Sequence, residues 1–113
     1  MVIKELLEEL RTRDQPLAKA LHKGAHSKVL VLGFKKGMLM KEHVAHLPSK
    51  LVVLSGAVVY TEGAKATTLR LYEEIEIPVG IVHAVEALED SLCLLAQGKA
   101  ACDASCPAAK GQP

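Results

Sequence analysis

The spacing of apolar residues changes once along the chain, near Pro16. Apolar residues before that point recur at the three- and four-residue spacing of an α-helix, with charged residues between them: Ile3, Leu6, Leu7 and Leu10. The pattern predicts one short amphipathic helix over residues 2–13, within an N-terminal segment 1–14.

After residue 16 the apolar residues form short runs separated by turn-forming residues. Many short strands without helices between them are typical of an antiparallel sandwich or barrel, and they exclude a parallel α/β sheet. We therefore expect an all-β domain over residues 15–97. Its strands are predicted at 17–22, 27–34, 38–43, 50–54, 57–62, 66–71, 74–77, 81–86 and 91–97. Beyond Gln97 the periodicity is lost, so residues 98–113 are expected to form a loosely ordered and dispensable tail.

Two of the predicted strand regions, KVLVLGF and LVVLSGAVVY, are apolar at nearly every position. A sheet with one face in water alternates apolar and polar residues instead, so something must cover the outer face of these strands. The N-terminal helix or a second subunit would do so. Because contiguous apolar surface on a monomer usually marks an interface, we expect a homodimer.

Composition narrows the class of partner. The 113 residues suit one domain, and 14 basic against 13 acidic residues leave a net charge of +1. No overall field therefore attracts nucleic acid or an anionic membrane, and three aromatic residues offer no surface for stacking bases. Neither nucleic acid nor a membrane is therefore an expected partner.

The N-terminus and the cysteines both bear on location. The acidic, amphipathic N-terminus lacks the basic start and unbroken apolar run of a signal peptide, and no later run reaches spanning length. Three cysteines are an odd number for a disulfide framework, so we expect a cytoplasmic protein with reduced thiols. Cys93 is read as a small core residue, and a Cys102–Cys106 disulfide stays open as an alternative.

Two segments, GMLMKEHVAHLPSKLVVLSG and PVGIVHAVEALEDS, resemble the two motifs of the cupin family of small antiparallel double-stranded β-helix (jelly-roll) barrels. The residues that fit the motifs in register are Gly37, His43, Gly56, Pro78, Gly80 and His83. The resemblance implies a jelly-roll barrel and places His43 and His83 at two of the family's four metal-ligand positions. At the other two this chain has Ala45 and Ser49. Tyr72 replaces a motif glycine, which we expect to affect a turn only.

His46 follows His43 closely in the stretch KEHVAHLPSK. In a regular strand positions 43 and 46 point to opposite faces, so both reach one ion only if the chain bulges or turns between them, as HLPS permits. A site of His43, His46 and His83 would suit a divalent transition metal: Zn, Fe, Ni, Mn or Cu. In the alternative without metal, His43 and His83 face the barrel interior, bonded to each other or to water, and His46 caps a loop.

Two classes of function therefore remain open. One is a cupin-like enzyme whose metal supports isomerase, dioxygenase or lyase chemistry on a small, rather apolar substrate. The other is a metal-free barrel that binds a ligand or serves as a structural dimer module without catalysis. The remaining histidines, His22 and His26, flank a glycine in a predicted hairpin and are read as solvated.

Overall fold

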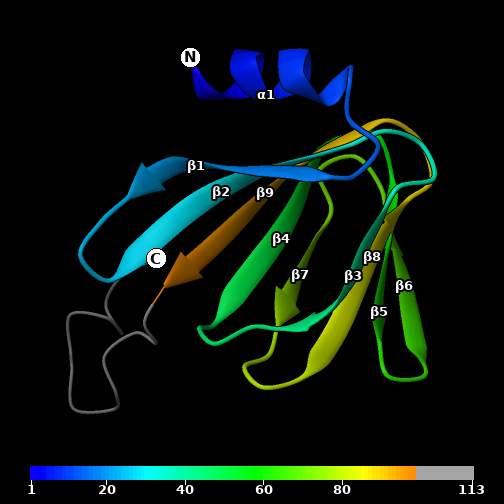
Figure 1. Ribbon diagram of the computed structural model, residues 1–113. Helices are drawn as coiled ribbons and strands as arrows, with labels where there is room; N and C mark the ends of the chain where they lie inside the picture. The colour runs from blue at the N-terminus through cyan, green and yellow to red at the C-terminus, as the bar shows by residue number, and fades with distance from the viewer. Residues whose placement is uncertain (99–113) are drawn as a thin grey trace.

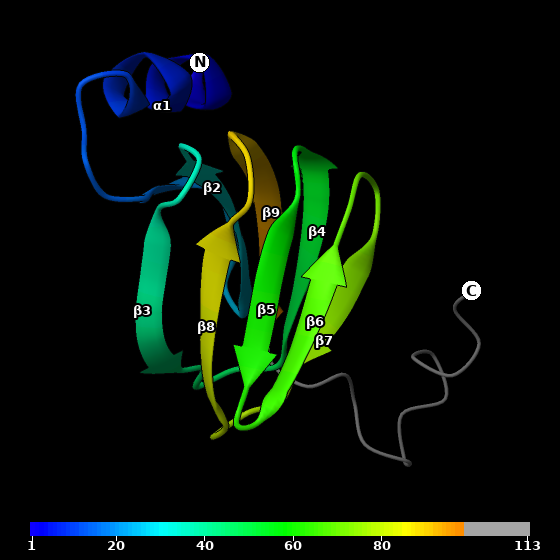
Figure 2. The ribbon, with the colours of Figure 1, turned by 90° about the vertical axis from the view of Figure 1, so that its right-hand side faces the viewer.

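Two antiparallel sheets, of five and four strands, face each other and a single helix lies over one of them (Figures 1 and 2). The structure, a computed structural model, describes residues 1–98. The predicted tail thus lies, apart from its first residue, outside the described residues. The elements are α1 (Val2–Leu10), β1 (Leu17–Lys23), β2 (Ser27–Phe34), β3 (Leu39–Val44), β4 (Ser49–Ser55), β5 (Val58–Glu62), β6 (Lys65–Leu69), β7 (Glu74–Ile77), β8 (Val82–Ala87) and β9 (Ser91–Gly98).

The strand order confirms the antiparallel jelly roll expected from the sequence. One sheet runs β1-β2-β9-β4-β7 and the other β3-β8-β5-β6, with every paired neighbour antiparallel. Each predicted strand is present, with ends shifted by at most two residues. The helix was predicted three residues too long. It ends at Leu10 because the amides of residues 11–13 donate to carbonyls three residues back, which tightens the last turn.

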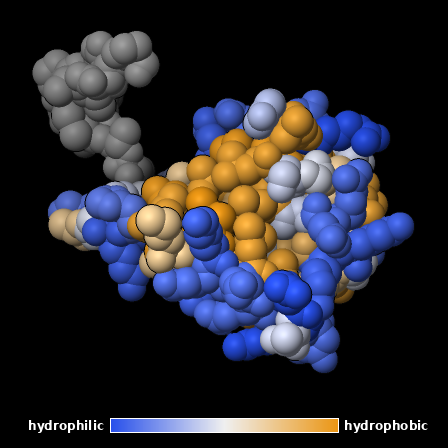
Figure 3. Space-filling view, turned by 90° about the horizontal axis from the view of Figure 1, so that it is seen from above, coloured by the Kyte–Doolittle hydropathy of each residue, from blue (hydrophilic) through white to orange (hydrophobic). Residues whose placement is uncertain are grey.

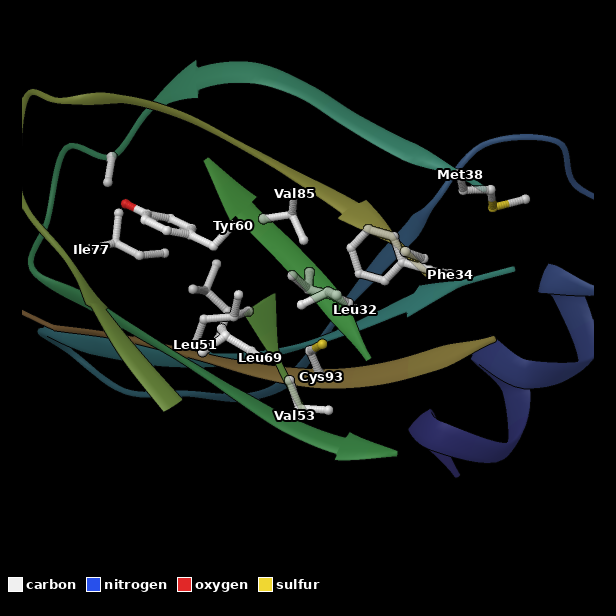
Figure 4. Close-up of a cluster of buried hydrophobic side chains, with 14 of the residues drawn as sticks. Leu32, Phe34, Met38, Leu51, Val53, Tyr60, Leu69, Ile77, Val85 and Cys93 are labelled. Atoms are coloured by element: carbon white, nitrogen blue, oxygen red, sulfur yellow. The ribbon is translucent and has the colours of Figure 1, made fainter. Parts of the chain in front are cut away.

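The core lies between the two sheets and is mostly aliphatic (Figure 4). Along β4, β5, β8 and β9, buried residues alternate with half-exposed or exposed ones, as expected for strands with one face toward a core. Phe34 and Tyr60 are its two large aromatic residues. Cys93 is a buried free thiol within this core, as the sequence predicted.

Helix α1 packs on the outer face of the larger sheet over β1 and β2. Leu6 and Leu10 are buried there, directly over Gly33, where a Cβ atom would collide with Leu6 Cδ2. An ion pair of 2.6 Å between Lys19 Nζ and Glu9 Oε1 ties the helix to β1. The helix therefore provides part of the cover that the two-sided apolar strands require. No helix within residues 1–98 is long and apolar enough to span a bilayer.

Left-handed backbone occurs at five turn residues within the range 1–98, and three of them bear on the predicted turns. Gly37 and Gly56 have φ of +85° and +83°, which glycine adopts without penalty. Tyr72, at the position of the missing motif glycine, has φ of +66° and a largely exposed side chain. This turn thus holds a residue type that disfavours its conformation.

Candidate functional site

His43 and His83 lie directly opposite each other on β3 and β8. The pairing shifts by one residue between Met40 and His43, which marks a β-bulge in β3. Because of this extra residue, Met40 and His43 both pair with residues that face the interior, Val85 and His83. The two imidazole rings are 4.2 Å apart between centroids and tilted by 59°.

Each of these imidazoles is oriented by the backbone carbonyl two residues before it in the chain. His43 Nδ1 lies 2.9 Å from the carbonyl oxygen of Lys41, and His83 Nδ1 lies 3.2 Å from that of Ile81. A carbonyl oxygen can only accept, so both Nδ1 atoms carry the proton and donate it. A neutral ring then keeps its lone pair on Nε2, which is the arrangement typical of metal-binding histidines.

His83 is buried, with 3 % of its surface exposed, whereas His43 is exposed. Burial lowers the pKa of His83 below its ordinary 6.5, and the nearby His43 acts in the same direction, while the Ile81 carbonyl and Glu62 oppose the shift. Tyr60 stacks on His83 at 5.7 Å, and its hydroxyl donates to Glu62 Oε1 at 2.8 Å. His83 is therefore held as a neutral, oriented imidazole at neutral pH.

A cavity of about 150 Å³ opens at this end of the barrel between the two sheets. His43, His46 and His83 all line it, so the structure brings the three predicted site residues to one cavity. His46 reaches it from the bend after β3, which is the turn that HLPS permits. The Gly80 amide donates to the Ala45 carbonyl at 3.0 Å and joins the two loops around the opening.

The three imidazoles share the cavity without converging on one point. Among residues 1–98, no group of three His, Cys, Asp or Glu side chains gathers closely enough to hold a metal ion. The residues present therefore fit a metal as a two-histidine pair, with His46 as a nearby side chain on an exposed loop.

The cavity wall opposite the histidines carries polar side chains that were not identified from the sequence. Lys28, Gln97 and Ser49 pair across β2, β9 and β4 and line the cavity. Ser49 Oγ accepts from Gln97 Nε2 at 3.1 Å and donates to the Leu47 carbonyl at 2.9 Å. Strand alternation predicts that these side chains point inward. They become neighbours only because Gln97 pairs with Ser49, 48 positions away in the sequence, and with Lys28, 69 positions away, and local sequence patterns do not encode such pairing.

The other two histidines do not line this cavity. His22 and His26 are exposed in the β1–β2 hairpin region, as predicted. The acidic residues near the motifs are also exposed: Glu42, Glu73, Glu74 and Glu76. The sequence analysis did not identify Glu62 as a site residue. Glu62 lies on β5 and pairs with His83 on β8, which in turn pairs with His43 on β3, so the three residues form one row across the strands.

No protein-family model matches the sequence, and no curated protein matches it either. The fold, in contrast, is similar to many solved structures. A conserved protein of unknown function from Streptococcus pyogenes matches with 26% identity and a TM-score of 0.70, covering 80% of this chain and 79% of that one. A cupin superfamily protein from Desulfitobacterium hafniense matches with 18% identity and a TM-score of 0.71, covering 77% and 80%.

A third similar structure is an uncharacterised conserved protein with a double-stranded β-helix domain from Klebsiella pneumoniae. It matches with 20% identity and a TM-score of 0.71 and covers 82% of this chain and 85% of that one. These similarities agree with the strand order of the two sheets. The chain has the double-stranded β-helix fold of the cupins.

Proposed function

We propose that this small cupin domain binds a small molecule at the cavity mouth through a divalent transition metal held by His43 and His83, with His46 as an adaptable third ligand. The observation that carries the proposal is the pair of oriented rings 4.2 Å apart, in each of which Nδ1–H donates a hydrogen bond to a backbone carbonyl oxygen. Both Nε2 lone pairs are thereby left for an ion. When bound, a metal of this class supplies Lewis acidity toward a carbonyl, water or dioxygen.

The chain's own residues indicate which ligand would suit the cavity. The loops at its opening expose apolar side chains, among them Leu47, Val79 and Ile81. Lys28 and Gln97 on the opposite wall offer hydrogen-bond donors. We therefore propose a small ligand with an apolar part and an oxygen-rich or anionic part, which Lys28 and Gln97 would orient toward the histidines.

Metal binding can be tested on protein purified without an affinity tag or chelator. We expect near-stoichiometric transition metal by elemental analysis, or tight binding of added Zn²⁺ or Ni²⁺ by titration. His43→Ala and His83→Ala should each abolish retention, whereas His46→Ala should weaken it. His22→Ala and His26→Ala are the matched controls, because they remove exposed imidazoles that do not line the cavity, and they should change nothing.

The pH dependence of metal binding gives a second readout. Only neutral imidazole ligates, and burial holds the pKa of His83 below 6.5, so metal affinity should fall as the pH drops below 6.5 through that lowered pKa. Metal content that is unchanged in both His43→Ala and His83→Ala would contradict the proposed site.

The second candidate is a metal-free barrel that binds a ligand, or serves as a dimer module, without catalysis. Lys28 favours it, because an ammonium group on the cavity wall opposes a cation held by neutral ligands. So does Ser49, which places a neutral hydroxyl at a family ligand position. Absence of metal in the parent protein, together with no binding of added metal, would support this candidate over the first.

We also propose that the protein works in the cytoplasm as a homodimer. The buried free thiol of Cys93 agrees with a reducing compartment, since oxidising compartments favour paired cysteines.

A further inference from the structure

Two lysines face each other near the tip of the β1–β2 hairpin. Lys23 on β1 is paired with Lys28 on β2, so both side chains lie on the same face of the larger sheet, with Cβ atoms about 5 Å apart. Like charges directly opposite each other destabilise a pair of strands. Neither lysine makes an ion pair with a residue in the range 1–98. The hairpin therefore holds two neighbouring positive charges without an acidic partner in the described part of the chain.

A bulge in β1 brings Lys23 to this position. Ala20 pairs with Leu30, and the register then shifts, so that Lys23 rather than His22 lies opposite Lys28. Leu30 packs against the core, and alternation along β2 places Lys28 on the same inner face. Bulges of this kind re-aim side chains and are frequent beside functional sites. The irregularity thus turns an ammonium group of β1 toward the inner face, as the bulge in β3 turns an imidazole.

The paired lysines lie beside the histidine cavity. A second space of about 460 Å³, lined by hairpin residues 23–28 and by Leu47, is called here the basic hollow. Lys28 and Leu47 also line the histidine cavity, so the two spaces adjoin. In Figure 1 the hairpin lies at the same end of the molecule as the loop from β3 to β4. Figure 3, in which the hairpin projects at the left, shows mostly hydrophilic side chains on it, whereas apolar side chains gather in the middle of the view.

The charge around the two spaces has one sign. Among the described residues, no Asp or Glu lines either of them. The net charge of +1 conceals this asymmetry, because residues 15–61 contain seven lysines and a single acidic residue, Glu42. Gln97 extends the lysine pair along the sheet, since it pairs with Lys28, and its amide has one N–H beyond the one donated to Ser49 Oγ. The side chains in this row therefore offer several hydrogen-bond donors and two positive charges to one ligand group.

We propose that Lys23 and Lys28 bind the phosphate group of a small phosphate monoester. Its organic part would extend into the histidine cavity, and this extension rests on the proposed function. Two ammonium groups balance the charge of about −2 that a phosphate monoester carries near neutral pH, and its three terminal oxygens can accept from both lysines and from Gln97. A carboxylate carries one charge and two oxygens, so it would leave one lysine unbalanced.

Inorganic phosphate is the first probe, added to the metal-free full chain and followed by amide chemical shifts in NMR spectra. We expect millimolar binding, with the largest shifts at residues 23–28 and at Gln97. Lys23→Gln and Lys28→Gln should each weaken phosphate binding about tenfold or more, since each removes a charge-assisted hydrogen bond. Lys36→Gln is the matched control, because it removes an exposed lysine beyond the other end of β2 and should change nothing.

Lys23→Glu tests the charge pair without any ligand. It places a carboxylate opposite Lys28, so the thermal midpoint in phosphate-free buffer should rise by about 2–5 °C, and phosphate should no longer bind. A midpoint that does not rise would contradict the repulsion between the two lysines.

Phenyl phosphate tests whether one ligand spans both spaces. It should bind more tightly than inorganic phosphate and shift the amides of His43 and His83 as well as those of the hairpin. Benzoate has the same ring with a carboxylate, and it should bind more weakly than phenyl phosphate.

Four results would overturn the proposal in whole or in part. If phosphate shifts no hairpin amide even at tens of millimolar, the lysines only protect the edge strand β1 from pairing with other chains. An equal loss of binding in Lys36→Gln would show that the attraction is not specific to the pair. Benzoate that binds as tightly as phenyl phosphate would refute the choice of phosphate. Phenyl phosphate that shifts hairpin amides alone would refute the extension into the histidine cavity.

The failure of this proposal is distinguishable from failure of the proposed metal site, because phosphate binding is measured without metal. Metal retention by the parent protein without phosphate binding would refute the lysine site alone. Phosphate binding by a protein that retains no metal would refute the metal site and support the lysine site.

Discussion

Replacing Gly56 by alanine should destabilise the barrel far more than replacing Gly37, although both glycines have nearly the same left-handed φ of +83° and +85°. Around Gly37 there is open space, with nothing within 4 Å of a built Cβ atom. At Gly56 the same atom would collide with the Asp90 carbonyl oxygen and Ser91 Oγ, and it would lie 2.8 Å from Ser91 Cα. Comparing Gly37→Ala with Gly56→Ala therefore separates the free-energy cost of a left-handed φ from that of steric crowding around the new Cβ atom.

The magnitudes follow from these surroundings. An alanine with left-handed φ destabilises the folded state by about 1–2 kcal/mol, while the smaller conformational freedom of the unfolded chain offsets about 0.4–1 kcal/mol of this cost. Gly37→Ala should therefore lower the free energy of unfolding by about 1 kcal/mol. Gly56→Ala adds overpacking of about 1–3 kcal/mol. It also displaces Ser91 Oγ, which accepts from the Ala57 amide at 3.1 Å and donates to the Glu89 carbonyl at 2.7 Å. Losing these buried bonds brings the total to about 3–5 kcal/mol.

Urea unfolding followed by circular dichroism measures both free energies of unfolding, and no tryptophan is needed. The thermal midpoint should fall by about 4–8 °C per kcal/mol in a domain of this size, so the two variants should differ clearly. Equal losses in the two variants, or a larger loss for Gly37→Ala, would refute the role assigned to the contact between the Gly56 turn and Ser91.

Three further predictions concern single side chains. Burial raises the pKa of the Cys93 thiol to about 12. In a variant with serine at the other two cysteines, a thiol reagent should therefore react with Cys93 only after unfolding. Reaction of the native variant at mildly alkaline pH would contradict this expectation. The pKa of His83 is lower in the folded protein than in the unfolded chain, so the unfolded chain binds a proton first as the pH falls below 6.5. The contribution of His83 to the free energy of unfolding is therefore complete above pH 6.5, and it is lost as the pH falls through the folded-state pKa. A plot of the unfolding free energy against pH should show this slope in the metal-free protein and a shallower one in His83→Gln. Tyr72→Gly should stabilise the fold by about 0.5–1 kcal/mol, because glycine adopts the left-handed φ of this turn without steric strain. A thermal midpoint of Tyr72→Gly below that of the parent protein would contradict this prediction.

The fold could be predicted from the sequence because its determinants are local. Turn residues separate the strands, and alternation of apolar residues identifies their inward faces, so each strand was placed within two residues. The end of α1 was less predictable. Arg11 and Arg13 suit a helical pattern, but their amides bond three residues back, and composition does not distinguish that turn from another helical one.

The site could be predicted only in part. His43 and His83 were located through their motif positions, and the structure places their rings side by side. Strict alternation along β3 from Met40 would instead have pointed Glu42 inward and His43 outward. Glu62 and Lys28 reach the site through strand pairing across long sequence separations, which depends on the whole topology.

The bulge in β3 also determines which genetic changes the mouth of the barrel can tolerate. Substitutions replace one side chain at a time, whereas the residue that meets His83 is set by how many residues separate Met40 from His43. Deleting one of the two intervening residues would straighten the strand and still leave His43 opposite His83. Inserting one would force a wider bulge or bring another residue to that position. Length changes at this point are therefore asymmetric in their consequences: a shorter strand keeps the imidazole pair, and a longer one puts it at risk.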